Sequence, residues 1–299
     1  MTWQFEVVAG PYQGPTGGVV WHDEAVLFSV IDEGRMLRFD PDTGATTEFR
    51  RYANRVNGLA LGPDGELYGA QEGGRRLVEF TPDGRLVAVD ALLDGKYHNQ
   101  PCDLVVDKRH RIWFADPRHA VIPFGPAIFP FLDHASVLRL ERNDRRAWVA
   151  RRITYDTVCP RAVVLSPDES TLYVADGEPA PEHKRELRAY PIDADGTVGH
   201  PAVLHTFGAD HRGPHRGIEG MCLDSESNIV ACGGWSRSGP GPLVYVFSPR
   251  GAVIESHPFP ADRPNRCCFG GKALDTLYVT TAGGELYRAG TGGRHGRNR

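Results

Sequence analysis

Short apolar stretches separated by polar turns recur six times along this chain. Each copy opens on a small or polar residue, runs through an apolar strand and a polar turn, and ends in a second apolar strand. The spacing between copies, about 40 to 60 residues, favours four-stranded blades over a helical repeat. We therefore expect an all-β fold, a six-bladed β-propeller. The copies begin at Gly17, Asn57, Cys102, Arg161, Glu219 and Asn265.

The later part of each copy supplies the outer strands. A third and a fourth strand follow in the first five copies, whereas the sixth copy has no fourth strand of its own. Residues 3–9 (WQFEVVA) form a separate apolar strand that can fill this place. We predict that this N-terminal strand closes the ring in the last blade and thereby removes its exposed edges.

Length and composition add limits to this picture. No flexible or charged linker interrupts the 299 residues, so we expect one domain over residues 1–290 and a flexible tail over 291–299. The net charge of −4 offers no clustered positive field for nucleic acid. The absence of a secretory leader and of a long apolar run favours a cytoplasmic protein without a membrane partner. Six sparse cysteines without C-x-x-C spacing indicate free thiols. A homo-oligomer is compatible with this composition.

The loops that lead into the first strand of every blade share one face and surround one axis. Short generic turns fall on the opposite face, whereas irregular sequence gathers on the first. We expect function there, since loops on a rigid scaffold carry binding groups. The segment 116–134 is rich in Pro, Phe and Ile. We interpret it either as an apolar wall or lid over the central pocket or as an insert that packs on a neighbouring blade or a partner chain.

Several phrases of the chain resemble the senescence-marker-protein and gluconolactonase family, the sugar lactone lactonases that are six-bladed propellers. These phrases are SPDESTLYVAD, RIWFADP, NGLALGPDGELYGAQEGGRRL and FGGKALDTLYVT. The resemblance covers nearly the whole chain. It implies a hydrolase that opens a small cyclic ester, a sugar lactone or a related polar or carboxylated lactone, in the central channel. It also implies a divalent cation, usually calcium, at the top of that channel.

The resemblance places the family's cation ligands at three positions of this sequence. Gly17 stands where the family has a Glu, Arg161 where it has an Asn, and Glu219 where it has an Asp. A hard cation needs about six or more oxygen ligands, and a guanidinium close by would repel it. We therefore expect the calcium site to be absent or weakened, with Arg161 in the electrostatic role of the metal and paired with Glu219. A purely structural ion pair is the alternative.

The resemblance and the blade symmetry together name candidate site residues. Glu219 is the first candidate for the general base, and Arg161 is the candidate cation. Asp103 and Asp116 are alternative carboxylates. The candidate substrate contacts are Asn57, His98, Asn99, Cys102, His215 and Asn265. Glu219 is also the candidate metal ligand, and His98 and His215 could join it to bind zinc, manganese or iron.

Two classes of function stay open at this point. The first is an enzyme, either a lactonase-like hydrolase with an altered calcium site or a metal-free or histidine-metal propeller enzyme of different chemistry, such as a strictosidine-synthase-like condensation. The second is a non-catalytic small-molecule binder. In both cases the expected partner is a small molecule in the central channel.

Overall fold

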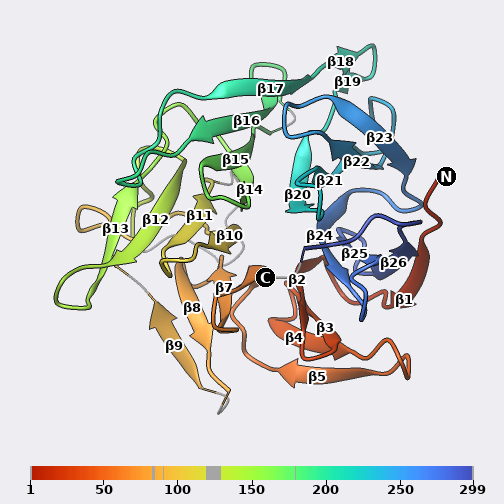
Figure 1. Ribbon diagram of the computed structural model, residues 1–299, viewed down its shortest axis with the longest axis horizontal. Helices are drawn as coiled ribbons and strands as arrows, with labels where there is room; N and C mark the ends of the chain where they lie inside the picture. Colours follow the sequence, from red (N-terminus) through yellow and green to blue (C-terminus); the bar gives the residue numbers. More distant parts are fainter. Residues whose placement is uncertain (1, 83–84, 90, 119–128, 179, 298–299) are drawn as a thin grey trace.

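The computed structural model describes residues 2–82, 85–89, 91–118, 129–178 and 180–297. Six antiparallel sheets of four strands each stand around a central axis (Figure 1). The predicted all-β, six-bladed β-propeller is confirmed. The described residues form no helix that is long and apolar enough to cross a membrane.

The blades follow one another in chain order, and the first strand of each contacts its neighbours around the axis. Blade 1 has β2 (Thr16–His22), β3 (Ala25–Val30), β4 (Arg35–Phe39) and β5 (Thr46–Arg50). Blade 2 has β6 (Val56–Leu61), β7 (Leu67–Gln71), β8 (Arg76–Phe80) and β9 (Leu86–Val89). Blade 3 has β10 (Asp103–Val106), β11 (Ile112–Asp116), β12 (Ser136–Arg142) and β13 (Trp148–Arg152).

The second half of the ring repeats this order. Blade 4 has β14 (Pro160–Leu165), β15 (Thr171–Asp176), β16 (Arg185–Pro191) and β17 (Ala202–Phe207). A small hairpin of β18 (Ala209–Asp210) and β19 (Gly213–Pro214) precedes blade 5. Blade 5 has β20 (Ile218–Leu223), β21 (Ile229–Gly233), β22 (Leu243–Phe247) and β23 (Val253–Pro258). Blade 6 has β24 (Pro264–Gly270), β25 (Thr276–Thr281), β26 (Leu286–Gly290) and the N-terminal β1 (Glu6–Ala9).

The ring closes inside blade 6. Strand β1 pairs antiparallel with β26, and Glu6 lies opposite Arg288. This pairing confirms the prediction that an N-terminal strand completes the last blade. Because β1 covers the edge of β26, blade 6 reaches four strands like the other blades, and the two ends of the chain are joined within one sheet.

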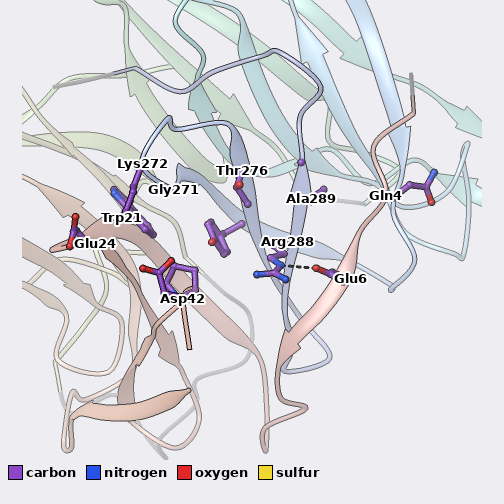
Figure 2. A pocket seen from close by; sticks show the side chains of 13 residues that line it. Gln4, Glu6, Trp21, Glu24, Asp42, Gly271, Lys272, Thr276, Arg288 and Ala289 are labelled. Carbon is purple, nitrogen blue, oxygen red and sulfur yellow. Dashed lines mark hydrogen bonds and ion pairs between the residues drawn. The ribbon is translucent and has the colours of Figure 1, made fainter. Parts of the chain in front are cut away.

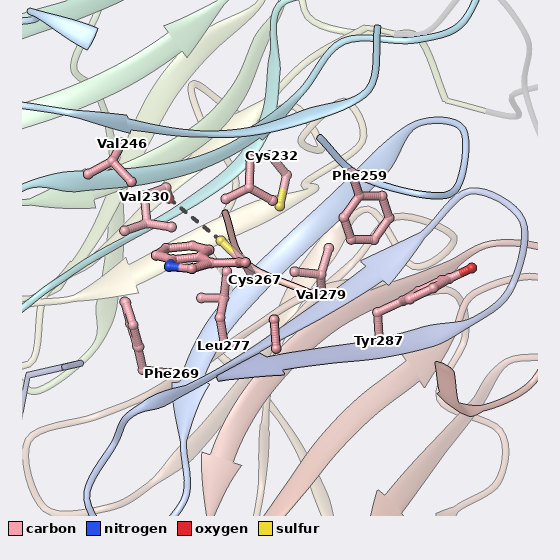
Figure 3. Close-up of a cluster of buried hydrophobic side chains, with 12 residues drawn as sticks. Val230, Cys232, Val246, Phe259, Cys267, Phe269, Leu277, Val279 and Tyr287 are labelled. Atoms are coloured by element: carbon pink, nitrogen blue, oxygen red, sulfur yellow. Dashed lines mark hydrogen bonds between the residues drawn. The ribbon is translucent and has the colours of Figure 1, made fainter. Parts of the chain in front are cut away.

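Apolar side chains fill the space between neighbouring blades. Figure 3 shows the cluster between blades 5 and 6, where Val230 packs with Leu277 and Val279. Burial of side chains of this size stabilises the fold by roughly 1.5–3 kcal/mol each. Cys232 and Cys267 lie in the same cluster as free thiols, as predicted for cysteines that act as small apolar residues.

We call the face on which the inner strands begin the upper face. Most inner strands carry a β-bulge at this end. The pairing register shifts there in blades 1, 2, 4, 5 and 6. A bulged residue leaves the hydrogen-bond ladder and its side chain is redirected. The residues inside these shifts are Gly17, Gly18, Asn57, Arg161, Glu219, Asn265 and Arg266. The bulges therefore act at the positions that open the repeated sequence pattern.

The segment that follows β26 has defined contacts on the lower face. The hydroxyl of Thr291 donates to the carbonyl of Asp275 at 2.7 Å. The guanidinium of Arg294 forms ion pairs with Asp224, at the end of inner strand β20, and with Glu255. These contacts lie within residues 291–297 of the expected tail, and Gly296 forms a β-bridge with Asp224.

Candidate functional site

A cavity of about 230 Å³ opens on the upper face at the axis. All six blades contribute to its wall. The lining residues are Pro15, Ile31, Arg55, Asn57, Glu72, Cys102, Arg161, Arg216, Glu219, Arg263, Asn265, Arg266 and Ala282. The wall therefore includes five of the six residues that open the sequence copies. The sixth, Gly17, is not in the wall, but Pro15, two residues before it, is.

Glu219 is clamped between two guanidiniums. Its Oε2 accepts from Arg161 Nη2 at 2.5 Å and from Arg161 Nε at 3.2 Å, and its Oε1 lies 2.8 Å from Nη2 of Arg216. Burial alone would raise the pKa of Glu219, but the charges of Arg161 and Arg216 outweigh it and lower that pKa to about 2. In turn Glu219 raises the pKa of Arg161 against the opposing effect of burial. Glu219 is therefore an ionised anchor for two cations.

Arg266 extends across the axis from blade 6. Its Nη1 donates to the carbonyl of Arg161 at 3.0 Å, and its Nη2 donates to the carbonyl of Cys102 at 2.8 Å. The same nitrogen lies 3.4 Å from Oδ1 of Asn57. Arg266 is only 6% exposed, so it places a nearly buried positive charge at the base of the cavity and ties blades 2, 3 and 4 to blade 6.

Three further charged residues come from the loops above the inner strands. Arg55 forms an ion pair with Asp32 and lies 3.9 Å from Glu72. Glu72 accepts from Nδ2 of Asn57 at 3.3 Å. The side chain of Arg263 is 47% exposed, and its nearest carboxylate oxygen, on Asp262, is 3.9 Å away.

Five charged residues of the cavity wall were not predicted from the sequence: Arg55, Glu72, Arg216, Arg263 and Arg266. A sequence signal existed for two of them, because Arg55 and Arg263 each stand two residues before an asparagine that opens a copy, in R-V-N and R-P-N. Glu72 lies in the turn after β7, which the pattern of first residues does not mark.

Cys102 and Asp103 lie at the base of blade 3. The thiol of Cys102 is directed at the carbonyl of Arg161 at 3.5 Å, and burial raises its pKa to about 12, so it stays protonated. Oδ2 of Asp103 accepts from the backbone N–H of Val163 at 3.0 Å. Burial raises the pKa of Asp103 to about 6, although Arg266 opposes this. Asp103 is not part of the cavity wall and joins blade 3 to blade 4.

The asparagines of the wall make defined contacts. Nδ2 of Asn265 donates to the carbonyl of Thr16 at 2.8 Å, which links blade 6 to blade 1. Asn57 donates to Glu72 and accepts from Arg266. Both amides lie where a ligand in the cavity would meet them, while they also hold neighbouring groups in place.

His98, Asn99 and Asp116 form a separate buried cluster beside residues 129–134. Asn99 donates from its backbone to Oδ2 of Asp116 at 2.8 Å, and from Nδ2 to the carbonyl of His134 at 2.8 Å. Its Oδ1 accepts from the N–H of Leu132 at 2.8 Å. The ring of His98 packs edge-on against Phe114 at 5.0 Å.

This cluster holds the described ends of the segment 116–134 and lies outside the cavity wall. Burial raises the pKa of Asp116 to about 6, against the opposing effects of the neighbouring His98 and of hydrogen bonds from the backbone. The placement corrects the prediction that His98, Asn99 and Asp116 face the central cavity, because their side chains are occupied within blade 3 and its loops. Residues 119–128, which carry the wall-or-lid interpretation, lie outside the described residues.

The predicted histidine metal site is not assembled in the described part of the chain. His215 lies against the β18–β19 hairpin, 3.7 Å from Asp210, and is absent from the cavity wall. The described residues do bring together one group with metal-ligand proximity, Asp64, Glu66 and His110. This group lies in turns of the lower face and includes none of the predicted ligands.

The residues at the axis do not fit the family's calcium site. At Gly17 an added Cβ would lie 2.9 Å from the carbonyl oxygen of Asn57 and 2.8 Å from Ile31, so a longer side chain would require the inner strands to shift. At the second position Arg161 brings a positive charge. At the third, both oxygens of Glu219 already contact guanidiniums. The donor set for a hard cation is therefore missing.

A second cavity, of about 240 Å³, lies at the lower edge of the junction between blades 6 and 1. Figure 2 shows it, with the ion pair of Glu6 and Arg288 on one side and Trp21 on the other. It contains none of the residues predicted from the sequence. The axial cavity is therefore the candidate functional site.

Comparison with known proteins agrees with the fold. Residues 15–283 match the family described as "SMP-30/Gluconolactonase/LRE-like region". The chain belongs to this family. A gluconolactonase of Zymomonas mobilis is 27% identical and is aligned over 93% of this chain and 78% of its own length. A pentonolactonase of Haloferax volcanii is 26% identical over 90% of this chain and 81% of its own length.

Solved structures show the same architecture. A gluconolactonase from Xanthomonas campestris superposes with a TM-score of 0.79 at 24% sequence identity, over 96% of this chain and 89% of its own. At this identity the likeness establishes the fold. The chain is thus a member of this family that has the propeller fold, and arginines line its axial cavity.

Proposed function

We propose that this chain hydrolyses a small cyclic ester, a sugar lactone or a related polar or carboxylated lactone, in the axial cavity. Relatives that align along most of its length are named for lactone hydrolysis. The observation that carries the proposal is the set of guanidiniums, Arg161 and Arg266 among them, at the axial position of the family's cation. Fixed cations can supply the electrostatic role of a metal where negative charge develops.

Arg161 and Arg266 are the candidate electrophilic groups. Arg161 is oriented by Glu219, and Arg266 is oriented by backbone carbonyls on blades 3 and 4. A lactone carbonyl directed at this base of the cavity gains negative charge as its carbon is attacked. Because both guanidiniums are held in place before the reaction, they stabilise that charge with little rearrangement.

Glu72 is the best-placed general base in the described cavity wall. Glu219 is a weak base, because Arg161 and Arg216 hold its pKa at about 2. Asp103 lies outside the wall and its Oδ2 accepts from Val163. Glu72 is 7% exposed, and its closest described contact is a single amide hydrogen bond of 3.3 Å. We therefore assign Glu219 the role of positioning the two arginines and Glu72 that of activating water.

The proposed reaction follows from these roles. Glu72 takes a proton from a water molecule while the water oxygen bonds to the lactone carbonyl carbon. The carbonyl oxygen becomes negative next to Arg161 and Arg266. The bond from the carbonyl carbon to the ring oxygen then breaks, the ring oxygen takes up the proton, and a hydroxy acid leaves the cavity.

Proton release tests this function directly. Each neutral lactone that opens at neutral pH yields one ionised acid, so a pH-stat records turnover above the spontaneous rate. We expect Glu72→Gln to remove most of this activity, whereas Arg151→Gln on outer strand β13, whose side chain is 59% exposed, should retain it. Failure of every lactone in a panel of aldonic and aldaric lactones would contradict the proposal.

A non-catalytic binder is the second candidate. The doubly clamped Glu219 favours it, because the carboxylate at the family's ligand position is held by Arg161 and Arg216. A binder would be stabilised against heat by hydroxy acids without turning over any lactone. Thermal shifts measured beside the proton-release assay therefore separate the two functions.

A further inference from the structure

The wall of the axial cavity has an excess of positive charge. Five arginines and two glutamates line it in the described structure. One of the glutamates, Glu219, is shared between Arg161 and Arg216. Among the wall residues the guanidiniums therefore outnumber the carboxylates, although Asp32 and Asp103, outside the wall, lie close to Arg55 and Arg266. Such an excess in a partly closed cavity attracts and holds anions.

The arginines occupy two levels. Arg161 and Arg266 lie in the bulges at the start of the inner strands, at the base of the cavity. Arg55, Arg216 and Arg263 lie in the loops above β6, β20 and β24, and we call these three the rim arginines. If Arg161 and Arg266 at the base of the cavity contact the lactone carbonyl, the rim arginines can contact another part of the substrate.

Among the rim arginines, Arg263 has the weakest contact with a carboxylate, whereas Arg216 is held by Glu219. The nearest carboxylate to Arg263 is that of Asp262, 3.9 Å away and 45% exposed, where solvent screens the interaction. Arg55 is paired with Asp32, whose side chain is 47% exposed. Arg55 and Arg263 also share a left-handed backbone, with φ of 56° and 52°, in the repeated R-x-N phrase.

We infer that the substrate of this enzyme carries a negative group besides its lactone ring, and that Arg55, Arg216 and Arg263 bind this group. The inference rests on the lactone hydrolysis proposed above. A carboxylate, phosphate or sulfonate shares the required chemistry, because guanidinium nitrogens match paired oxygens of such groups. The cavity of about 230 Å³ limits the ligand to about one sugar ring with a short substituent.

Matched lactones test this inference. An aldonic lactone with a neutral 6-hydroxyl is compared with its 6-carboxylate and its 6-phosphate under proton release, each corrected for spontaneous opening. We expect kcat/KM at least ten times higher for one of the charged lactones, and a decline of this advantage as salt is raised. The better of the two charged lactones identifies the anion. Equal kcat/KM for neutral and charged lactones would overturn the inference and leave lactone hydrolysis intact.

Arginine variants locate the anion site. Arg263→Gln should raise KM for the preferred charged lactone about tenfold and reduce the charged-to-neutral ratio of kcat/KM, and Arg263→Lys should restore part of it. Arg151→Gln removes an equal charge from outer strand β13 and should leave the ratio unchanged. A ratio that does not change in Arg263→Gln and Arg216→Lys would overturn the assignment to the rim.

Binding of stable acids tests the anion site independently of lactone hydrolysis. If no lactone is hydrolysed, lactone hydrolysis fails, and the rim is then tested by calorimetry with open-chain acids. An aldarate, with two carboxylates, should bind at least tenfold more tightly than an aldonate with one. Equal affinities, or affinities insensitive to Arg263→Gln, would remove the anion site as well.

Discussion

Two groups of polar residues on the upper face look alike in sequence and differ in space. The first surrounds the axial cavity and includes Arg161, Glu219 and Arg266. The second, beside residues 129–134, includes Asn99 and Asp116. In the first, charged groups border open volume. In the second, the backbone N–H, the side-chain Nδ2 and the side-chain Oδ1 of Asn99 all form hydrogen bonds with the surrounding chain. Both polar atoms of its side chain are therefore already engaged within the protein.

The difference lies in how the backbone presents each residue. Arg161, Glu219 and Arg266 sit in β-bulges at the start of inner strands, which redirect side chains toward the axis. Asn99 and His98 precede inner strand β10, which pairs with β11 without a register shift. For these two groups, the residues inside a bulge line the axial cavity, whereas those before the regular strand β10 contact the surrounding loops.

Removing the charge at Glu219 should have the largest effect on stability. Glu219→Gln leaves Arg161 and Arg216 together without their shared anion, and loss of one partner of a buried pair costs about 3–5 kcal/mol. The folded pKa lies below the ordinary 4.5, at about 2, so this stabilisation is present above pH 4.5 and is lost as the pH falls toward 2. Denaturant unfolding at several pH values measures it.

An exposed pair provides the control for Glu219. Glu6→Gln breaks the ion pair with Arg288 at 2.6 Å, in which the side chains are 63% and 37% exposed. It should change stability by less than about 1 kcal/mol. If Glu219→Gln were as stable as Glu6→Gln at neutral pH, the clamp would not be the anchor of the axial cluster.

Loss of the proposed base should have the largest effect on chemistry. Glu72→Gln keeps the size of the side chain and removes its ability to take a proton. We expect kcat to fall by about 10²-fold or more while KM changes little. Steady-state proton release measures both constants. A variant with wild-type kcat would return the role of base to another residue.

Asn99→Ala should act on stability alone. It removes the acceptor of the Leu132 N–H and the donor to the His134 carbonyl, and an unpaired buried group costs about 1–3 kcal/mol. The melting temperature should fall, whereas kcat/KM of the folded enzyme should stay within about twofold. A large drop in kcat/KM at unchanged stability would place Asn99 in the site after all.

Metal removal should have the smallest effect. Arg161 and Gly17 leave the axis without a calcium donor set, so EDTA and added calcium should change neither the melting temperature nor the rate of lactone opening. Metal analysis of protein purified without chelator checks this independently. Stoichiometric calcium would show that the axial cluster rearranges to bind the ion.

The fold and part of the site were predictable because they depend on local patterns. Strand alternation and turn residues define the blades, and the missing fourth strand of blade 6 pointed to the N-terminal segment. Position in the repeat placed Arg161 and Glu219 at one axis. Arg266 was not predicted, because its reach across the channel depends on a shift in β24 that no residue type announces. Asn99 was misassigned, because its partners come from residues more than 30 positions away.

The ring is completed by a pairing between a strand made early and a strand made late. Glu6 lies opposite Arg288. A ribosome adds about 5–20 residues per second, so β1 waits roughly 15–60 s for its partner to emerge. Blades 1 to 5 can become ordered during translation, whereas blade 6, which supplies Arg263 and Arg266 to the cavity, follows only afterwards. A newly made chain therefore acquires its capacity to bind ligand as the last step of its maturation.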